Sequence, residues 1–163
     1  MQTWVTRRKA TNAGLSNYSW TDTGRTIDAR GVKMAAISIR DLGANGVLSF
    51  DLIDLLRLAG PAVAASSWLC SGVEATGPRA DEIHAAADCG VVLGGDELLR
   101  IASGISQVID GDFRAMTGPG AQPWLRIRAI DSSEFVVIGT DEAVLARISA
   151  AYRDVHPSPE DDL

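Results

Sequence analysis

From Met34 onward, short apolar runs of strand length alternate with stretches of helical periodicity, and this alternation restricts the chain to a mixed helix and strand architecture. The last three apolar runs, about 108–116, 124–131 and 134–139, follow one another through short connections. Consecutive strands joined by short loops pair antiparallel. The pattern therefore predicts an α+β fold of mixed helices with a C-terminal antiparallel three-stranded meander, followed by an amphipathic helix.

The helical stretches show the clearest local signals. Leu52, Leu55, Leu56 and Ala59 lie at i, i+3, i+4 and i+7, after Ser49 as the expected N-cap. The last helix is expected to begin after a Thr140 cap and to run to about residue 152. Further helices are predicted over about 79–88 and 95–105, and further strands over 35–40, 67–75 and 91–93.

Charge divides the chain into unlike parts. Residues 1–33 hold six basic and two acidic residues, a net +4, so the rest of this −6 chain carries −10. We predict that 1–33 is a basic, disordered arm, or a stretch preceding a true start at Met34. Residues 34–156 are expected to form a single α+β domain, and the Pro- and acid-rich residues 157–163 a disordered acidic tail.

Neither a membrane span nor a disulfide scaffold is expected. The longest apolar neighbourhood, 58–70, is interrupted by Pro61, Ser66 and Ser67, whereas a span takes about 20 strongly apolar residues. Only two cysteines are present, which is typical of a reduced setting, and no secretory signal is seen. These features predict a cytoplasmic protein, and the low lysine count is typical of a GC-rich bacterial genome.

The sequence offers one arrangement that resembles catalytic chemistry. The common nucleotide, metalloprotease and hydrolase motifs are absent. Cys70, His84 and Asp88 could form a nucleophile, base and orienting carboxylate, because His84 and Asp88 are four residues apart on a predicted helix. The alternative is that the cysteines are small buried residues and His84 lies on the helix surface.

Four carboxylates mark the last three predicted strands. Asp131 and Glu134 flank the Ser132-Ser133 turn, and Asp110 and Asp112 lie on the preceding strand. A hard metal ion would need several such oxygens converging on one point. Solvated strand ends are the commoner explanation for such residues, so no metal or cofactor is predicted.

The hairpin register gives the sharpest inference. If Ser132-Ser133 is a two-residue turn, then Ile130 faces Phe135 and Ala129 faces Val136. One sheet face then carries an unmixed apolar core. The other face is neither core-like nor polar, and it carries Trp124, Arg126, Arg128, Ile130, Phe135 and Val137.

The last helix or residues 61–65 could cover the apolar part of this second face, with the arginine stems alongside, which would make the face structural. If the face is open, three functions fit it and the remaining motifs. Tryptophan, phenylalanine and arginine are enriched in protein interfaces, so we expect a small regulatory, inhibitor or immunity-type domain that binds another protein through Trp124, Arg126, Arg128 and Phe135. A cysteine-dependent hydrolase or transferase using Cys70 and His84 is the alternative. A nucleic-acid-binding module is the second alternative, although the −10 body and a pairing of Asp110 and Asp112 with the two arginines count against it.

Overall fold

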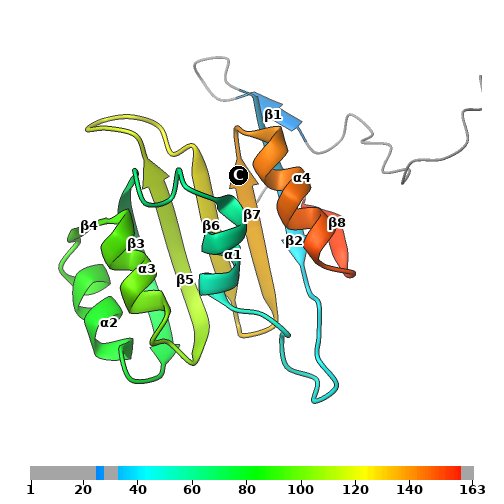
Figure 1. Cartoon of the computed structure of the whole chain (residues 1–163), viewed down its shortest axis with the longest axis horizontal. Helices are drawn as coiled ribbons and strands as arrows, with labels where there is room; N and C mark the ends of the chain where they lie inside the picture. Colours follow the sequence, from blue (N-terminus) through cyan, green and yellow to red (C-terminus); the bar gives the residue numbers. More distant parts are fainter. Residues whose placement is uncertain (1–24, 28–32, 159–163) are drawn as a thin grey trace, which may run out of the picture.

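The computed structural model describes residues 25–27 and 33–158, which form four helices and eight strands in two layers (Figure 1). Most of the predicted arm and residues 159–163 of the predicted tail lie outside the described residues. The strands are β1 Arg25–Ile27, β2 Lys33–Ile39, β3 Ser67–Thr76, β4 Val92–Gly94, β5 Gln107–Met116, β6 Leu125–Ile130, β7 Glu134–Gly139 and β8 Val155–Pro157. The helices are α1 Leu52–Ala59, α2 Ala80–Asp88, α3 Gly95–Ala102 and α4 Glu142–Ala151.

All described strands belong to one antiparallel sheet in the order β1-β2-β7-β6-β5-β3-β4, and β8 pairs with β2. The predicted α+β class is confirmed. The sheet is larger than the three-stranded meander that the sequence predicts, because β2 pairs with β7 and β3 pairs with β5. Both pairings join segments that are far apart in the chain.

Two short strands share the outer edge of β2. β1 pairs with residues 33–35 of β2, and β8 pairs with residues 37–39. β1 comes from the segment predicted as an arm, and β8 ends at Pro157, the first residue of the predicted tail. Proline suits this place, since its missing N–H is tolerated on an edge strand. The division of the chain at residues 33 and 156 stays a prediction.

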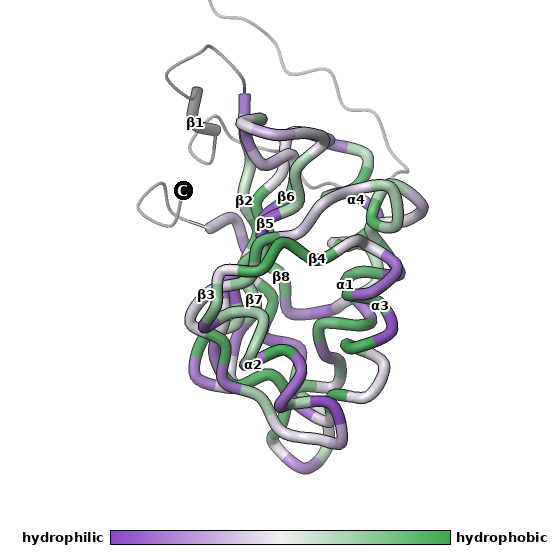
Figure 2. Tube along the Cα trace, turned by 90° about the vertical axis from the view of Figure 1, so that its left-hand side faces the viewer, coloured by the Kyte–Doolittle hydropathy of each residue, from purple (hydrophilic) through white to green (hydrophobic). Residues whose placement is uncertain are grey.

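The helices supply one side of a single main core. In Figure 2, α1, α3 and α4 lie on one side of the sheet, and α2 lies near β3. The buried residues of all four helices pack into one cluster with the inward residues of the strands, among them Trp68, Phe113, Ile127 and Phe135. Among the described residues, no helix has the length and apolar character needed to cross a membrane.

The opposite side of the sheet, which we call the helix-free face, has a smaller apolar cluster. Ala36, Val136 and Ile138 are at most 1% exposed there, and Met34 and Ile130 pack against them. No residue of the four helices belongs to this cluster. In the described part of the chain, the helices therefore cover only one side of the sheet.

The β6–β7 register differs by one residue from the predicted one. Ala129 pairs with Phe135 and Ile130 with Glu134. The reason is the turn: Asp131 and Ser132 both adopt positive φ, +47° and +57°, and the N–H of Ser133 donates to the Ile130 carbonyl at 3.0 Å, which leaves Ser133 as an extra loop residue. A slip of one residue moves every side chain of a strand to the other face.

Short polar side chains fix where the helices begin, a little later than predicted. Asp51, rather than Ser49, caps α1: its carboxylate accepts from the N–H of Leu52 at 2.7 Å, while its own N–H donates to Asp54 at 3.0 Å. Asp141, rather than Thr140, caps α4. Asp51 also accepts from the Val108 N–H at 3.1 Å, so this cap ties α1 to β5.

The β4–α3 junction depends on the absence of a side chain at Gly95. A Cβ placed there would lie 1.9 Å from the carbonyl oxygen of Val63. We expect Gly95→Ala to lower the free energy of unfolding by about 1–3 kcal/mol, because the backbone has to move to remove the clash. Gly94→Ala is the matched control, since no atom lies within 4 Å of its added Cβ, and we expect a change within about 0.5 kcal/mol. Urea denaturation measures both, and equal stability of the two variants would contradict this packing.

Candidate functional site

The structure separates the four residues predicted to form one binding face. Arg126 and Arg128 lie on the helix-free face, at alternate positions of β6 between buried residues. Phe135 is fully buried in the main core. Trp124 packs against that same core, and its indole N–H donates to the Ser66 hydroxyl at 2.8 Å. The prediction that the aromatic residues share a face with the arginines is therefore wrong, as a consequence of the register and of the Ser66 contact.

The observed register instead places a charged group around the two arginines. Arg114 lies directly opposite Arg126, and Asp112 lies directly opposite Arg128, across the β5–β6 pair. We call Asp112, Arg114, Arg126 and Arg128 the arginine cluster. Arg114 was not singled out from the sequence, although the alternation along β5 puts it on the same face as Asp112.

Asp112 is the centre of the arginine cluster. The Arg126 guanidinium donates to both of its carboxylate oxygens, from Nε and Nη2, each at 2.9 Å. Arg114 Nε donates to the same carboxylate at 3.1 Å. Such two-point contacts to a carboxylate are strong and fix the orientation of the guanidinium. They confirm the sequence expectation that Asp112 neutralises an arginine of β6.

These contacts also set the acidity of Asp112. Burial alone would raise the pKa of this carboxyl group, but the hydrogen bonds and positive charges of Arg126 and Arg114 outweigh burial and hold the pKa below its usual value. The Asp112 side chain is only 16% exposed, whereas those of Arg126 and Arg114 are 23% and 39% exposed. The arginines therefore form the accessible part of the cluster.

Apolar residues border the arginine cluster on both sides. Val136 and Ile138 lie directly opposite Arg128 and Arg126 on β7. The aliphatic stems of arginines at such positions can shield apolar neighbours from water. On the other side, Leu69 lies opposite Arg114, and Val92, which is 54% exposed, lies opposite Leu69.

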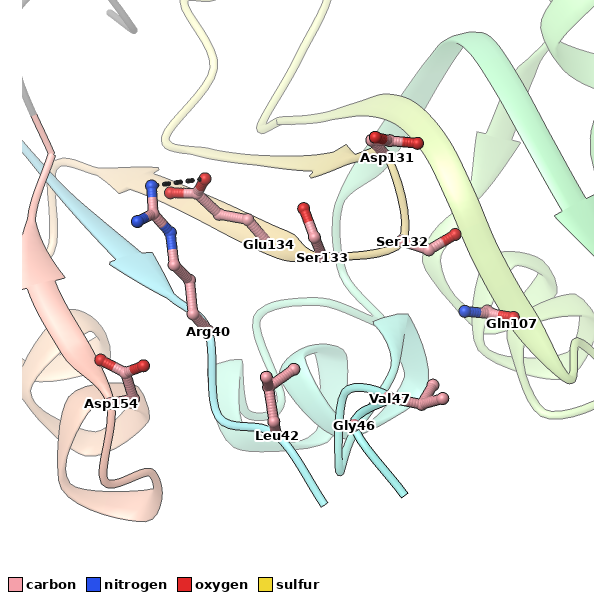
Figure 3. Close-up of a pocket in the computed structure, with 10 residues that line it drawn as sticks. All are labelled: Arg40, Leu42, Gly46, Val47, Gln107, Asp131, Ser132, Ser133, Glu134 and Asp154. Atoms are coloured by element: carbon pink, nitrogen blue, oxygen red, sulfur yellow. Dashed lines mark hydrogen bonds and ion pairs between the residues drawn. The ribbon is translucent and has the colours of Figure 1, made fainter. Parts of the chain in front are cut away.

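A pocket lies where the helix-free face ends at the β6–β7 turn (Figure 3). Its volume is about 620 Å³. Glu134 accepts from Arg40 at 3.0 Å and also from the Ser38 hydroxyl, so the ion pair drawn in Figure 3 joins the residue that follows β2 to the first residue of β7. Leu42 and Val47, which are 54% and 43% exposed, lie on the loop at the opposite rim. The pocket thus combines charged and apolar groups, as the face itself does.

The carboxylates noted in the sequence do not converge. Asp112 binds two arginines, Glu134 binds Arg40 and Ser38, and Asp110 accepts from the backbone N–H of Asp131 at 3.0 Å. Within residues 25–27 and 33–158, no group of three or more acidic, histidine or cysteine side chains is placed to hold a metal ion.

The structure gives no support for a cysteine nucleophile. Cys70 is fully buried, and burial together with the Asp112 carboxylate raises the pKa of its thiol to about 12. His84 Nε2 accepts a hydrogen bond from the Ala75 N–H of β3 at 3.0 Å, so this nitrogen is already engaged by the backbone. A thiolate at position 70 is therefore not available near neutral pH.

This burial gives a simple labelling prediction. In the native protein at pH 8, we expect iodoacetamide to modify Cys89, which is exposed, and to leave Cys70 unmodified. Unfolding in guanidinium should make both thiols reactive, which mass spectrometry would show as a second adduct. Rapid modification of Cys70 in the native state would contradict its buried position.

Comparisons of the chain with protein-family models, with curated proteins and with solved structures gave no significant match.

Proposed function

We propose that this chain is a protein-binding domain that contacts its partner through the helix-free face, with Arg126 and Arg128 at the centre of the contact. One observation supports this most: four of the nine arginines of residues 34–163 lie on this single face, although the same region carries a net −10. These are Arg40, Arg114, Arg126 and Arg128.

The residue types fit a protein partner better than a substrate or a nucleic acid. Arginines beside exposed apolar side chains such as Val92 are typical of protein interfaces, in which a few large or charged groups supply most of the binding energy. Nucleic acid is a less suitable partner. Asp110 and Glu134 share the face with the arginines, and a long polyanion would have to pass over them.

The proposal is tested by capture from a native lysate with three baits: the wild-type protein, Arg128→Ala and Arg57→Ala. Arg57 is the matched control, because it is an exposed arginine on α1, a helix on the other side of the sheet. We expect a protein that is retained by the wild type and by Arg57→Ala and is lost with Arg128→Ala. Circular dichroism would establish that all three baits are folded. Capture that is the same with all baits, or no specific capture, would overturn the proposal.

A further inference from the structure

The two ends of the sheet differ in how their outer edges are covered. At one end, the outer edge of β2 is paired with both β1 and β8. At the other end, β4 pairs with residues 67–69 of β3, and no further strand follows β4 in the described part of the chain (Figure 1). Beyond β4, α2 packs against β3, where His84 accepts from the Ala75 N–H. The accessible edge is therefore short, and it consists of β4 and the preceding Val91.

β4 lacks most of the features that protect an exposed edge strand from pairing. Charged side chains, prolines and bulges serve that purpose in other sheets. Residues 89–95 contain no charge and no proline, and β4 pairs with β3 in continuous register. Only its length of three residues limits pairing, which favours a short extended segment over a second sheet.

Two valines make this edge apolar. Val91 and Val92 are 47% and 54% exposed, and they are two of the four large apolar side chains that are exposed among the described residues. On the helix-free face, Val92 lies opposite the half-buried Leu69, whereas a Cβ added at Gly94 would have no atom within 4 Å. Side chains of a strand reach the same face at every second residue. An extended segment beside β4 therefore finds an apolar contact at Val92 and open space at Gly94.

Negative charge surrounds this uncharged strand. Residues 79–100, which contain α2, β4 and α3, hold two basic and five acidic residues, a net −3. Both basic residues, Arg79 and Arg100, pair with Glu82. Of the other acids, Asp81 lies in the first turn of α2, and three exposed ones flank β4 in the chain: Asp88, Asp96 and Glu97. Within residues 25–27 and 33–158, none of these three forms an ion pair.

The helix ends and the neighbouring strands adjust this charge without reversing it. The α3 N-terminus carries a partial positive charge that offsets part of Asp96 and Glu97, whereas Asp88 adds to the partial negative charge at the end of α2. On the sheet, Arg114 lies two strands from β4 and donates to Asp112. A ligand at β4 therefore meets net negative charge, which favours a ligand with basic groups.

We propose that the β4 edge is a second binding site, which takes a short extended peptide segment with apolar side chains at alternate positions and a lysine or arginine at each end. The segment adds to the sheet as one more strand, so its backbone pairs with the outward N–H and C=O groups of β4. Its basic ends lie near Asp88 on one side and near Asp96 and Glu97 on the other. A second copy of this chain fits less well, because it brings the same carboxylates to the interface. The site does not depend on the function proposed above.

The test is selection of random octapeptides displayed on phage against the wild-type protein, with removal of the peptides that also bind Val92→Lys. Lysine protects edge strands in other sheets, and Val92 is exposed, so this variant should fold with unchanged stability in urea. We expect the remaining peptides to have basic ends and alternating apolar residues. The most enriched one is synthesised with a fluorescent label, and its affinity is measured by anisotropy.

Three variants show whether the peptide binds as proposed. Val47→Lys is the matched control, because it adds the same charge at another exposed valine, on the loop between β2 and α1, and it should leave the affinity unchanged. Val92→Thr keeps a β-branched side chain and should bind within about threefold of the wild type. Asp88→Asn should weaken binding about threefold, the scale of an exposed ion pair.

Methylation of single backbone nitrogens of the selected peptide tests the pairing itself. In an added strand, the N–H groups point toward β4 at every second residue. We therefore expect methylation to weaken binding about tenfold at alternate positions, which is about 1.4 kcal/mol, and much less at the positions between them. No peptide that distinguishes the wild type from Val92→Lys, selected peptides without basic ends, or a loss that does not alternate along the peptide would each overturn the inference.

Discussion

Phe135→Ala is expected to lower the free energy of unfolding by about 3–5 kcal/mol, the range for removing a fully buried aromatic side chain. Phe135 is fully buried, and its ring centroid lies 5.4 Å from that of Phe50. The ring centroid of Phe50 in turn lies 4.3 Å from that of Tyr152, the residue at the end of α4. Removal of the Phe135 ring would leave a cavity between β7, the residues that precede α1 and the end of α4.

Urea denaturation monitored by circular dichroism measures this loss. Phe135→Leu is the matched variant, because it keeps most of the apolar volume and should cost less than about 1.5 kcal/mol. It also keeps the test decisive if the alanine variant does not fold. A loss below about 1 kcal/mol for Phe135→Ala would indicate that Phe135 lies on an exposed face, and it would contradict the observed register of β6 and β7.

Asp112→Asn is expected to lower the free energy of unfolding at pH 7 by about 2 kcal/mol, the scale of hydrogen bonds to a charged group. The substitution removes the charge that Arg126 and Arg114 share and leaves these two arginines opposite each other. Because the pKa of Asp112 is lowered in the folded protein, its ionised form stabilises the fold at pH values above its usual pKa. That stabilisation is lost as the pH falls through the lowered pKa.

The difference in the free energy of unfolding between the wild type and Asp112→Asn should therefore be largest at pH 7. It should shrink as the pH falls below about 4, where an aspartate in the unfolded chain takes up its proton. Chemical denaturation at several pH values measures it. Asp88→Asn is the control, since Asp88 is exposed at the end of α2, and we expect a change within about 0.5 kcal/mol. A difference that is absent at pH 7, or that is equal at pH 3 and pH 7, would contradict the contacts described for Asp112.

The positions of helices and strands follow closely from the sequence, because each depends on a local pattern. The spacing of Leu52, Leu55, Leu56 and Ala59 sets the buried face of α1, and all four are buried. Pairing between distant segments has no such local signal. Nothing in residues 33–39 indicates that β2 pairs with β7, about a hundred residues later, or that β8 covers part of its edge.

At the candidate site, the conformation of one turn changes which residues can form the predicted binding face. A two-residue turn at Ser132-Ser133 would have placed Phe135 beside the arginines. The turn uses Asp131 and Ser132 at positive φ, conformations that residues other than glycine adopt uncommonly, and the register moves by one. Trp124 was misplaced for a different reason, since its contact with Ser66 depends on the tertiary fold. Arg126 and Arg128 kept their predicted face, because the alternation within β6 is independent of the turn.

The most direct test uses the partner protein captured from lysate. After purification, its affinity for the wild type, for Arg128→Ala and for Arg57→Ala is measured by titration calorimetry. We expect an affinity about tenfold weaker for Arg128→Ala, a difference of about 1.4 kcal/mol, and an unchanged affinity for Arg57→Ala. Equal affinities for all three proteins would contradict the claim that the helix-free face binds the partner.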